Sequence, residues 1–225
     1  MRMLLFAGIL LPAALTAGQP PPADSPVIVV LGDSLSAAYG LPTERGWVAL
    51  LEARLADAGL AYRVVNASIS GDTTGGGLTR LPQVLERHRP AMVVVALGAN
   101  DGLRGIPVRQ IEDNLNAMVR LVRGAGADVL LVGVRLPPNY GAAYTEGFQA
   151  TLRGVADAGQ VPLVPDLLAG VAEDWRLMQA DGLHPTAEAQ PRILDNVWPG
   201  LEPLLGPRMG SWTQPAGRDP LASGR

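Results

Sequence analysis

The chain has 225 residues, of which 48% are hydrophobic and 17% are charged, and its formal net charge is −3. This composition suits one globular domain with a sizeable core, and the lack of clustered basic residues argues against a nucleic-acid partner. The sequence contains neither Cys nor Lys, which excludes thiolate nucleophiles, zinc–cysteine clusters and lysine Schiff bases. Only two His are present, which argues against a His-rich metal site.

The first residues have the pattern of a secretory signal peptide. A basic start, with Arg2, is followed by an apolar stretch at 4–15 and by small residues at 16–18. The apolar stretch is shorter than the ~20 residues that cross a bilayer, which argues against the alternative of an uncleaved membrane anchor. We therefore expect a signal peptide at 1–17, a Pro-rich leader at 18–26, and a periplasmic or secreted protein without a membrane span after cleavage.

Five short apolar runs follow along the chain. They are rich in Val, Leu and Ala and do not alternate with polar residues, which is typical of strands buried on both faces of a parallel sheet. The predicted strands are at 27–31, 62–67, 91–97, 129–134 and 161–164.

Between these runs, apolar residues recur at helical spacing. The predicted helices are at 46–58, 77–88, 107–124 and 144–158, with a last one that starts near Thr186. This alternation predicts a three-layer α/β domain over 27–205, with right-handed crossovers between parallel strands. Residues 206–225 are rich in Gly, Pro, Ser and Arg, and we expect them to form a disordered tail.

Ser34 follows the first predicted strand directly, in a Gly-Asp-Ser-Leu-Ser run at 32–36. Loops that leave the carboxyl ends of parallel strands carry the functional residues of such folds, so Ser34 is a candidate nucleophile. The alternative is a helix N-cap, a position that Ser also favours. The run is not the Gly-x-Ser-x-Gly elbow of the α/β-hydrolases.

A catalytic serine needs a base, and the sequence offers two histidines. His88 lies at the expected end of a helix among basic residues, an ordinary structural position. His184 lies in a loop between Asp181 and Pro185, and we expect it to take the proton of Ser34. Asp181 would orient the imidazole and stabilise its charged form, although Asp-Gly is also a common turn.

Two Gly-rich segments supply donors for a developing oxyanion. One is at 70–77, after the second predicted strand, and the other is at 98–102, after the third, where Asn100 carries a side-chain amide. With the Ser34 backbone N–H they make three candidate donors, although plain turns have the same composition. We expect Asp33, Asp72 and Asp101 to fix loops or cap helices.

Together these blocks resemble the GDSL/SGNH hydrolases. The resemblance spans about 27–205 and rests on Gly-Asp-Ser-Leu at 32–35, Gly71, Asn100 in Gly-Ala-Asn-Asp, and Asp181-x-x-His184. It implies a flavodoxin-like fold of five parallel strands with no metal or cofactor. It also implies Ser34, Asp181 and His184 as a catalytic triad. The implied oxyanion hole consists of the Ser34 N–H, the Gly71 N–H and the Asn100 side chain.

Further segments, at 101–105, 135–141 and 189–191, are similar to a subgroup of periplasmic arylesterases, acyl-CoA thioesterases and lysophospholipases. That similarity implies a mobile loop at 102–107 over the acyl chain and a groove beside Leu136. The candidate substrate contacts are Leu103, Arg104, Ile106, Leu136 and Tyr140.

We therefore expect a monomeric serine hydrolase that cleaves the esters and thioesters of small acyl substrates, including aryl esters, acyl-CoA and lysophospholipids. Two alternatives remain open at this point. One is a carbohydrate O-acetylesterase of the same fold, and the other is an α/β binding module without catalysis.

Overall fold

The computed structural model describes residues 22–206. The expected signal peptide at 1–17 lies outside these residues, and so do residues 18–21 of the expected leader at 18–26 and residues 207–225 of the expected tail at 206–225. Within the described part of the chain, no helix is both long enough and apolar enough to cross a membrane.

The centre of the molecule is a sheet of five parallel strands in the order β2-β1-β3-β4-β5. This is the flavodoxin-like order of doubly wound α/β proteins, the fold that the resemblance to the GDSL/SGNH hydrolases implies. The strands are β1 (Val27–Gly32), β2 (Arg63–Asn66), β3 (Met92–Ala96), β4 (Asp128–Val132) and β5 (Leu163–Val164).

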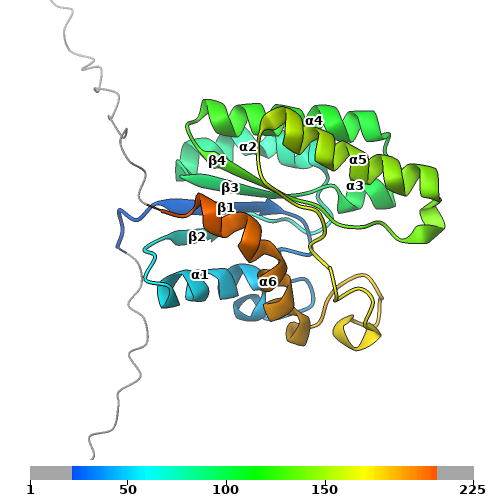
Figure 1. Cartoon of the computed structure of the whole chain (residues 1–225). Coiled ribbons are helices and arrows are strands. Elements are labelled where there is room, and N and C mark those ends of the chain that lie inside the picture. The colour runs from blue at the N-terminus through cyan, green and yellow to red at the C-terminus, as the bar shows by residue number, and fades with distance from the viewer. Residues whose placement is uncertain (1–21, 207–225) are drawn as a thin grey trace, which may run out of the picture.

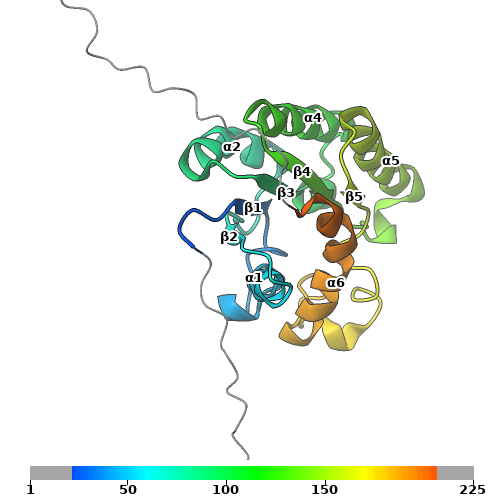
Figure 2. The same ribbon diagram turned by 60° about the vertical axis from the view of Figure 1, so that its left-hand side comes forward.

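Helices cover both faces of the sheet and give three layers (Figures 1 and 2). One face carries α2 (Thr74–His88), α4 (Val108–Gly124) and α5 (Ala142–Gly159). The other face carries α1 (Trp47–Asp57) and α6 (Gln190–Leu201).

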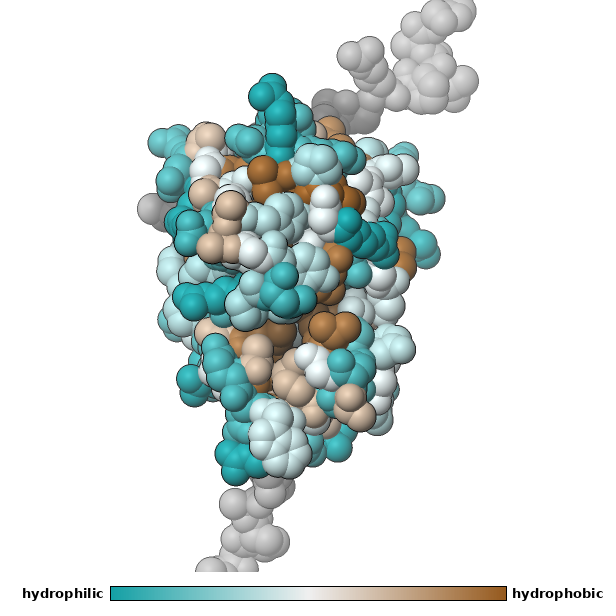
Figure 3. Space-filling view, turned by 90° about the vertical axis from the view of Figure 1, so that its right-hand side faces the viewer, coloured by the Kyte–Doolittle hydropathy of each residue, from teal (hydrophilic) through white to brown (hydrophobic). Residues whose placement is uncertain are grey.

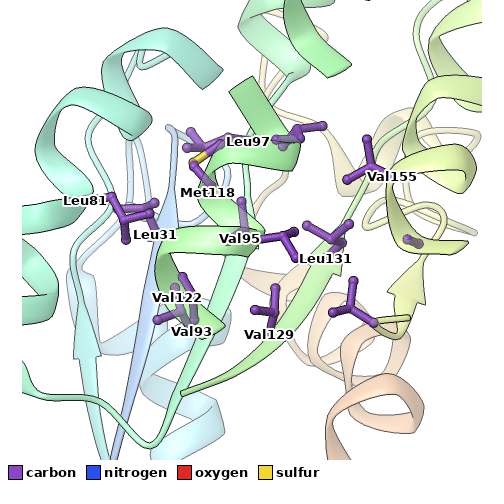
Figure 4. Packing of buried hydrophobic residues seen from close by; sticks show 14 of the residues in the cluster. Leu31, Leu81, Val93, Val95, Leu97, Met118, Val122, Val129, Leu131 and Val155 are labelled. Carbon is purple, nitrogen blue, oxygen red and sulfur yellow. The ribbon is translucent and has the colours of Figure 1, made fainter. Parts of the chain in front are cut away.

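Two hydrophobic cores, one on each side of the sheet, hold the layers together. Successive residues of a strand point to opposite faces, so Val29 and Leu31 of β1 enter one core while Ile28 and Val30 enter the other. Figure 4 shows the first core, where side chains from β1, β3 and β4 meet those of α2, α4 and α5. This double burial explains the unbroken apolar runs of the central strands.

Several elements differ from the sequence-based expectation. The edge strand β2 is only partly buried, with Arg63 and Asn66 exposed, because it has a neighbour on one side only. Helix α2 begins at Thr74 rather than at 77, since the Thr73 hydroxyl accepts a hydrogen bond from Gly76 N at 3.2 Å and caps the Gly-rich start.

A short helix, α3 (Ala99–Leu103), lies where the sequence predicted a loop. The last helix starts four residues later than expected, at Gln190, because a 3₁₀ turn (Ala187–Ala189) precedes it. The shifted starts of α2 and α6 concern the ends of elements, where caps and turns rather than apolar spacing decide the boundary.

The parallel strands bring their carboxyl ends to one edge of the sheet, at the right of Figure 1. The loops that follow β1, β2 and β3 lie at this edge beside one another because their strands are neighbours. Figure 3 views this end of the molecule, where hydrophobic surface is visible between hydrophilic side chains.

Candidate active site

Ser34 lies in a tight turn directly after β1. The backbone carbonyl of Asp33 accepts hydrogen bonds from the N–H groups of Ser36 and Ala37, at 3.1 and 2.9 Å. The Asp33 carboxylate accepts a further bond from the N–H of Leu35, at 3.0 Å. These bonds turn the chain sharply at the end of the strand and leave Ser34 half-buried at the edge of the sheet.

His184 reaches Ser34 from the other end of the sequence. Its Nε2 lies 2.9 Å from Ser34 Oγ, within hydrogen-bond distance, although the two residues are 150 positions apart. Its Nδ1 lies 2.6 Å from Asp181 Oδ2. The three side chains therefore form a continuous series from hydroxyl to imidazole to carboxylate, as the sequence predicted.

Asp181 is held as an anion. Its Oδ2 binds the His184 ring, while its Oδ1 accepts hydrogen bonds from the backbone N–H groups of Leu183 and His184, at 2.9 and 3.0 Å. The bond from the His184 side chain contributes most, and together these bonds lower the pKa of Asp181 to about 2. The carboxylate is therefore ionised at neutral pH and favours the Nδ1–H form of the imidazole.

Gly71 and Asn100 follow β2 and β3, the two strands that flank β1 and the Ser34 loop. Gly71 has a φ of +80°, a backbone conformation that favours glycine, and its carbonyl accepts a hydrogen bond from Arg104 Nη2 at 2.9 Å. Asn100 belongs to α3, and its amide nitrogen donates to Asp33 Oδ2 at 3.3 Å.

Buried polar contacts tie these loops to one another. Asp101 accepts hydrogen bonds from both the backbone N–H and the hydroxyl of Thr74, the first residue of α2, at 2.8 and 2.5 Å. Asp72 pairs with Arg80 at 2.8 Å. The expectation that Asp33, Asp72 and Asp101 fix loops is thereby confirmed.

Arg80 is a structural residue of this site that the sequence analysis missed. Besides Asp72, its guanidinium donates to the carbonyl of Ala67, after β2, and to the carbonyl of Gly32, at the end of β1. The sequence pattern does not predict that Arg80 binds these loops, because an Arg two turns into an amphipathic helix is usually solvated.

A cavity of about 170 Å³ opens beside Ser34 and His184. Most of its walls are apolar, and they come from the loops after β1, β3 and β4 together with the segment before His184. The apolar side chains that line it are Leu35, Ala99, Leu103, Val134, Leu136, Pro137, Leu168, Ala172, Met178 and Leu183.

Of the five candidate substrate contacts, Leu103 and Leu136 line this cavity. Arg104, Ile106 and Tyr140 are not among its lining residues. Instead, the Tyr140 hydroxyl donates to the carbonyl of Leu103 at 3.0 Å and so holds one wall of the cavity in place.

His88 is far from this chemistry. It ends α2 and lines a separate cavity of about 550 Å³ together with the first residues of β1 and β2, at the opposite edge of the sheet. Burial, and then the nearby Arg87 and Arg63, lower its pKa. Within residues 22–206, no group of three or more His, Asp or Glu side chains is arranged to hold a metal ion.

A serine hydroxyl, an imidazole and an ionised carboxylate in series, at the carboxyl edge of a doubly wound sheet, define the site of a serine hydrolase. The sequence pattern of the GDSL-like Lipase/Acylhydrolase family matches residues 30–191. The chain belongs to this family and is a serine hydrolase.

Known proteins of this family are similar along most of the chain. Esterase TesA of Pseudomonas aeruginosa is 53% identical over 205 residues, which cover 91% of this chain and all of that protein. The protein named thioesterase 1/protease 1/lysophospholipase L1 of Escherichia coli K12 is 44% identical over 178 residues, or 79% of this chain and 84% of that one. A crystal structure of TesA superposes with a TM-score of 0.78, at 56% identity, over 80% of this chain and 99% of that chain.

Proposed function

We propose that this enzyme hydrolyses esters and thioesters of medium and long acyl chains through an acyl-serine intermediate, with Ser34, His184 and Asp181 as its triad. The observation that carries the proposal is the 2.9 Å contact between Ser34 Oγ and His184 Nε2, backed by the 2.6 Å contact to Asp181. The names of the relatives, an esterase and a thioesterase/lysophospholipase, support the same substrate class.

In the first half of the reaction, His184 Nε2 takes the proton of Ser34 as Oγ attacks the acyl carbonyl carbon. The carbonyl π electrons move to the oxygen, whose negative charge accepts hydrogen bonds from the Ser34 N–H, the Gly71 N–H and the Asn100 amide. Asp181 stabilises the imidazolium that forms. When the intermediate collapses, the C–O or C–S bond breaks and the leaving group takes the proton from His184.

In the second half, a water molecule attacks the acyl-serine ester. His184 accepts a proton from the water, the same donors hold the new oxyanion, and the ester bond to Ser34 Oγ breaks. The carboxylic acid leaves, and Oγ regains its proton from His184.

The shape and polarity of the cavity favour acyl chains longer than acetyl. Most of the side chains that line it beyond Ser34 are apolar, among them Leu103, Leu136 and Leu168, and these offer no hydrogen bond to a sugar hydroxyl. Each buried CH₂ group of a substrate gains about 0.8 kcal/mol, so binding should strengthen as the chain lengthens until the cavity is filled. We place Arg104, Ile106 and Tyr140 around the mouth of the cavity, where they would shape its entrance.

A panel of p-nitrophenyl esters from C2 to C12 tests this function. We expect kcat/KM to rise from the C2 ester to the medium-chain esters in the wild type, and Ser34→Ala to abolish turnover of all of them. Ser36→Ala is the matched control, because Ser36 lies two residues away, is buried, and its hydroxyl has no hydrogen-bond partner among the described residues. Activity on acetyl esters alone would instead favour a carbohydrate O-acetylesterase, and no activity on any ester would favour a binding module.

We also propose that the enzyme is exported to the periplasm or secreted, in line with the basic start and the apolar stretch at 4–15. N-terminal sequencing of the protein recovered from periplasmic and culture fractions tests this. A mature chain that begins near residue 18 is expected, and an intact N-terminus in the cytoplasm would contradict export.

A further inference from the structure

Gln179 joins the loop that carries Ser34 to the loop that carries His184. Its side-chain Nε2 donates one hydrogen bond to the carbonyl of Tyr39 and another to the carbonyl of Pro185, each at 2.9 Å. Tyr39 lies five residues after Ser34, and Pro185 directly follows His184. A single amide group therefore contacts both halves of the site.

The backbone of Gln179 anchors the turn that presents His184. Its N–H donates to the carbonyl of His184 at 2.7 Å, and its carbonyl accepts from the N–H of Gly182 at 2.9 Å. The neighbouring pair Met178 and Pro185 forms an antiparallel β-bridge. Residues 178–185 thus form a small hairpin, and Gln179, Asp181 and His184 all lie between its two bridged residues.

Tyr39 connects this hairpin to the nucleophile. Its backbone N–H donates to the carbonyl of Ser34 at 3.3 Å, and its ring packs against the His184 ring, with 4.3 Å between centroids and 34° between planes. Ser34, Tyr39, Gln179 and His184 are thus connected in a closed series of hydrogen bonds. Tyr39 donates to Ser34, Gln179 donates to Tyr39 and to His184, and His184 contacts Ser34.

Gly40 shows how closely the two loops approach. It has a φ of +74°, and a Cβ atom at this position would lie 2.4 Å from Gln179 Oε1, far inside contact distance. The backbone of the first loop therefore packs directly on the Gln179 amide, and no side chain fits between them.

Few other bonds hold the two halves of the triad in register. Within residues 22–206, the segments 33–41 and 177–186 share two hydrogen bonds between them, the one from Gln179 to Tyr39 and the one between Ser34 and His184 themselves. The catalytic contact must also break and reform in each cycle, when His184 carries the proton. During those steps, the hydrogen bond from Gln179 to Tyr39 is the one of these two that still joins the segments.

We propose that Gln179 is a positioning residue, which holds the His184 hairpin against the Ser34 loop so that Nε2 stays aligned with Oγ. This inference rests on the proposed function of the triad. Proton transfer and nucleophilic attack depend steeply on geometry, and a misplacement of about 1 Å can cost about 100-fold in rate. Loss of the Gln179 bonds should therefore slow the chemical steps while it leaves the acyl cavity intact.

The test compares Gln179→Ala with Gln179→Glu, measured on a medium-chain p-nitrophenyl ester. Glutamate has the same shape, but its ionised carboxylate cannot donate to the two carbonyls. We expect both variants to lower kcat by about 10- to 100-fold with KM within about twofold of wild type. The rate at which a fluorophosphonate labels Ser34 should fall by a similar factor, because it reports the same alignment. A purely structural role would lower the thermal midpoint without this split between kcat and KM.

Arg176→Ala is the matched control, since Arg176 lies three residues before Gln179 and its hydrogen bonds and ion pair are with Asp174. It should keep the wild-type kcat. Gly40→Ala provides a second route, because the added methyl group must displace the Gln179 amide and the φ of +74° also strains an alanine in the Ser34 loop, so it should lower kcat as well. If the Gln179 variants do not fold, a wild-type kcat in Gly40→Ala overturns the inference.

Wild-type kcat and labelling rates in Gln179→Ala and Gln179→Glu would overturn the inference. The outcome for Ser34→Ala separates this failure from that of the proposed function. If Ser34→Ala is inactive while the Gln179 variants are normal, the triad stands and only the role of Gln179 is wrong. If Ser34→Ala remains active, the proposed function itself fails.

Discussion

The amide nitrogen of Asn100 donates a hydrogen bond to the carboxylate of Asp33, across 3.3 Å, beneath the turn that holds Ser34. A carboxylate only accepts hydrogen bonds, so this contact fixes which end of the Asn100 amide faces Asp33 and leaves its second N–H free to donate toward the site. Asp33 is 2% exposed, and its burial raises its pKa to about 6. At neutral pH the buried carboxylate of Asp33 is therefore charged, which costs stability, and in this form it orients the Asn100 amide.

Asp33→Asn should make the protein more stable at neutral pH and less active. The pKa of Asp33 is about 6 in the folded protein and 3.8 is its ordinary value, so the unfolded chain loses this proton first. The free energy of unfolding therefore falls as pH rises from about 4 to about 6. Asparagine removes that penalty, worth up to about 3 kcal/mol above pH 6. Urea unfolding at pH 8 and at pH 4 measures the difference.

The gain in unfolding free energy should be present at pH 8 and absent near pH 4, where the carboxyl is protonated in both states. The variant should also lose kcat, because an amide at position 33 no longer offers Asn100 a charged acceptor. A variant that is less stable than wild type at pH 8, or equally stabilised at both pH values, would contradict this explanation.

Asn100→Ala should lower kcat by about 10²- to 10³-fold, or about 2.7–4 kcal/mol of transition-state stabilisation, with little change in KM. The amide is expected to meet the oxyanion only as charge develops on the carbonyl oxygen, so ground-state binding is spared. Steady-state kinetics on one p-nitrophenyl ester suffices. Asn100→Asp should be at least as harmful, because its carboxylate repels the oxyanion; a loss below threefold in either variant would remove Asn100 from the mechanism.

Asp181→Asn should lower kcat by about 10⁴-fold, the size seen when a serine protease loses the charge of its triad carboxylate. The amide keeps the shape of the side chain but no longer stabilises the imidazolium or selects the Nδ1–H tautomer of His184. Since the pKa of Asp181 is about 2, its titration should not affect the wild-type rate between pH 4 and 9. Near wild-type kcat in Asp181→Asn would show that the carboxylate is dispensable.

Leu103→Trp should shorten the preferred acyl chain. Leu103 lines the cavity beside Ser34, and a larger ring there takes up part of its volume of about 170 Å³. We expect kcat/KM to fall for the C8 to C12 esters and to remain within about threefold of wild type for the C2 ester. An equal loss at all chain lengths would mean that the acyl chain binds elsewhere.

The central features of the fold follow from the sequence because burial on both faces of the sheet leaves an unambiguous trace. The runs that contain Val29 and Val93 have no polar residue to interrupt them, and both strands lie in the middle of the sheet. The start of α2 escaped prediction because three glycines disfavour a helix, whereas the Thr73 cap and the bonds to Asp101 outweigh them.

The candidate site was predictable where chemistry restricts the choice of residue. With no Cys or Lys and only two histidines, Ser34 has one plausible base, and the structure places His184 next to it. The supporting residues Arg80 and Gln179 were not predictable, since each acts on backbone carbonyls of distant loops. Such contacts depend on tertiary packing and leave no local pattern in the sequence.

The nucleophile is tested most directly by intact-mass measurement after treatment with a fluorophosphonate, followed by peptide mapping. The account predicts one adduct per chain, located on the peptide that contains Ser34, with none on Ser34→Ala and full labelling of Ser36→Ala. An adduct on another residue, or an active wild-type enzyme that forms no adduct, would contradict it.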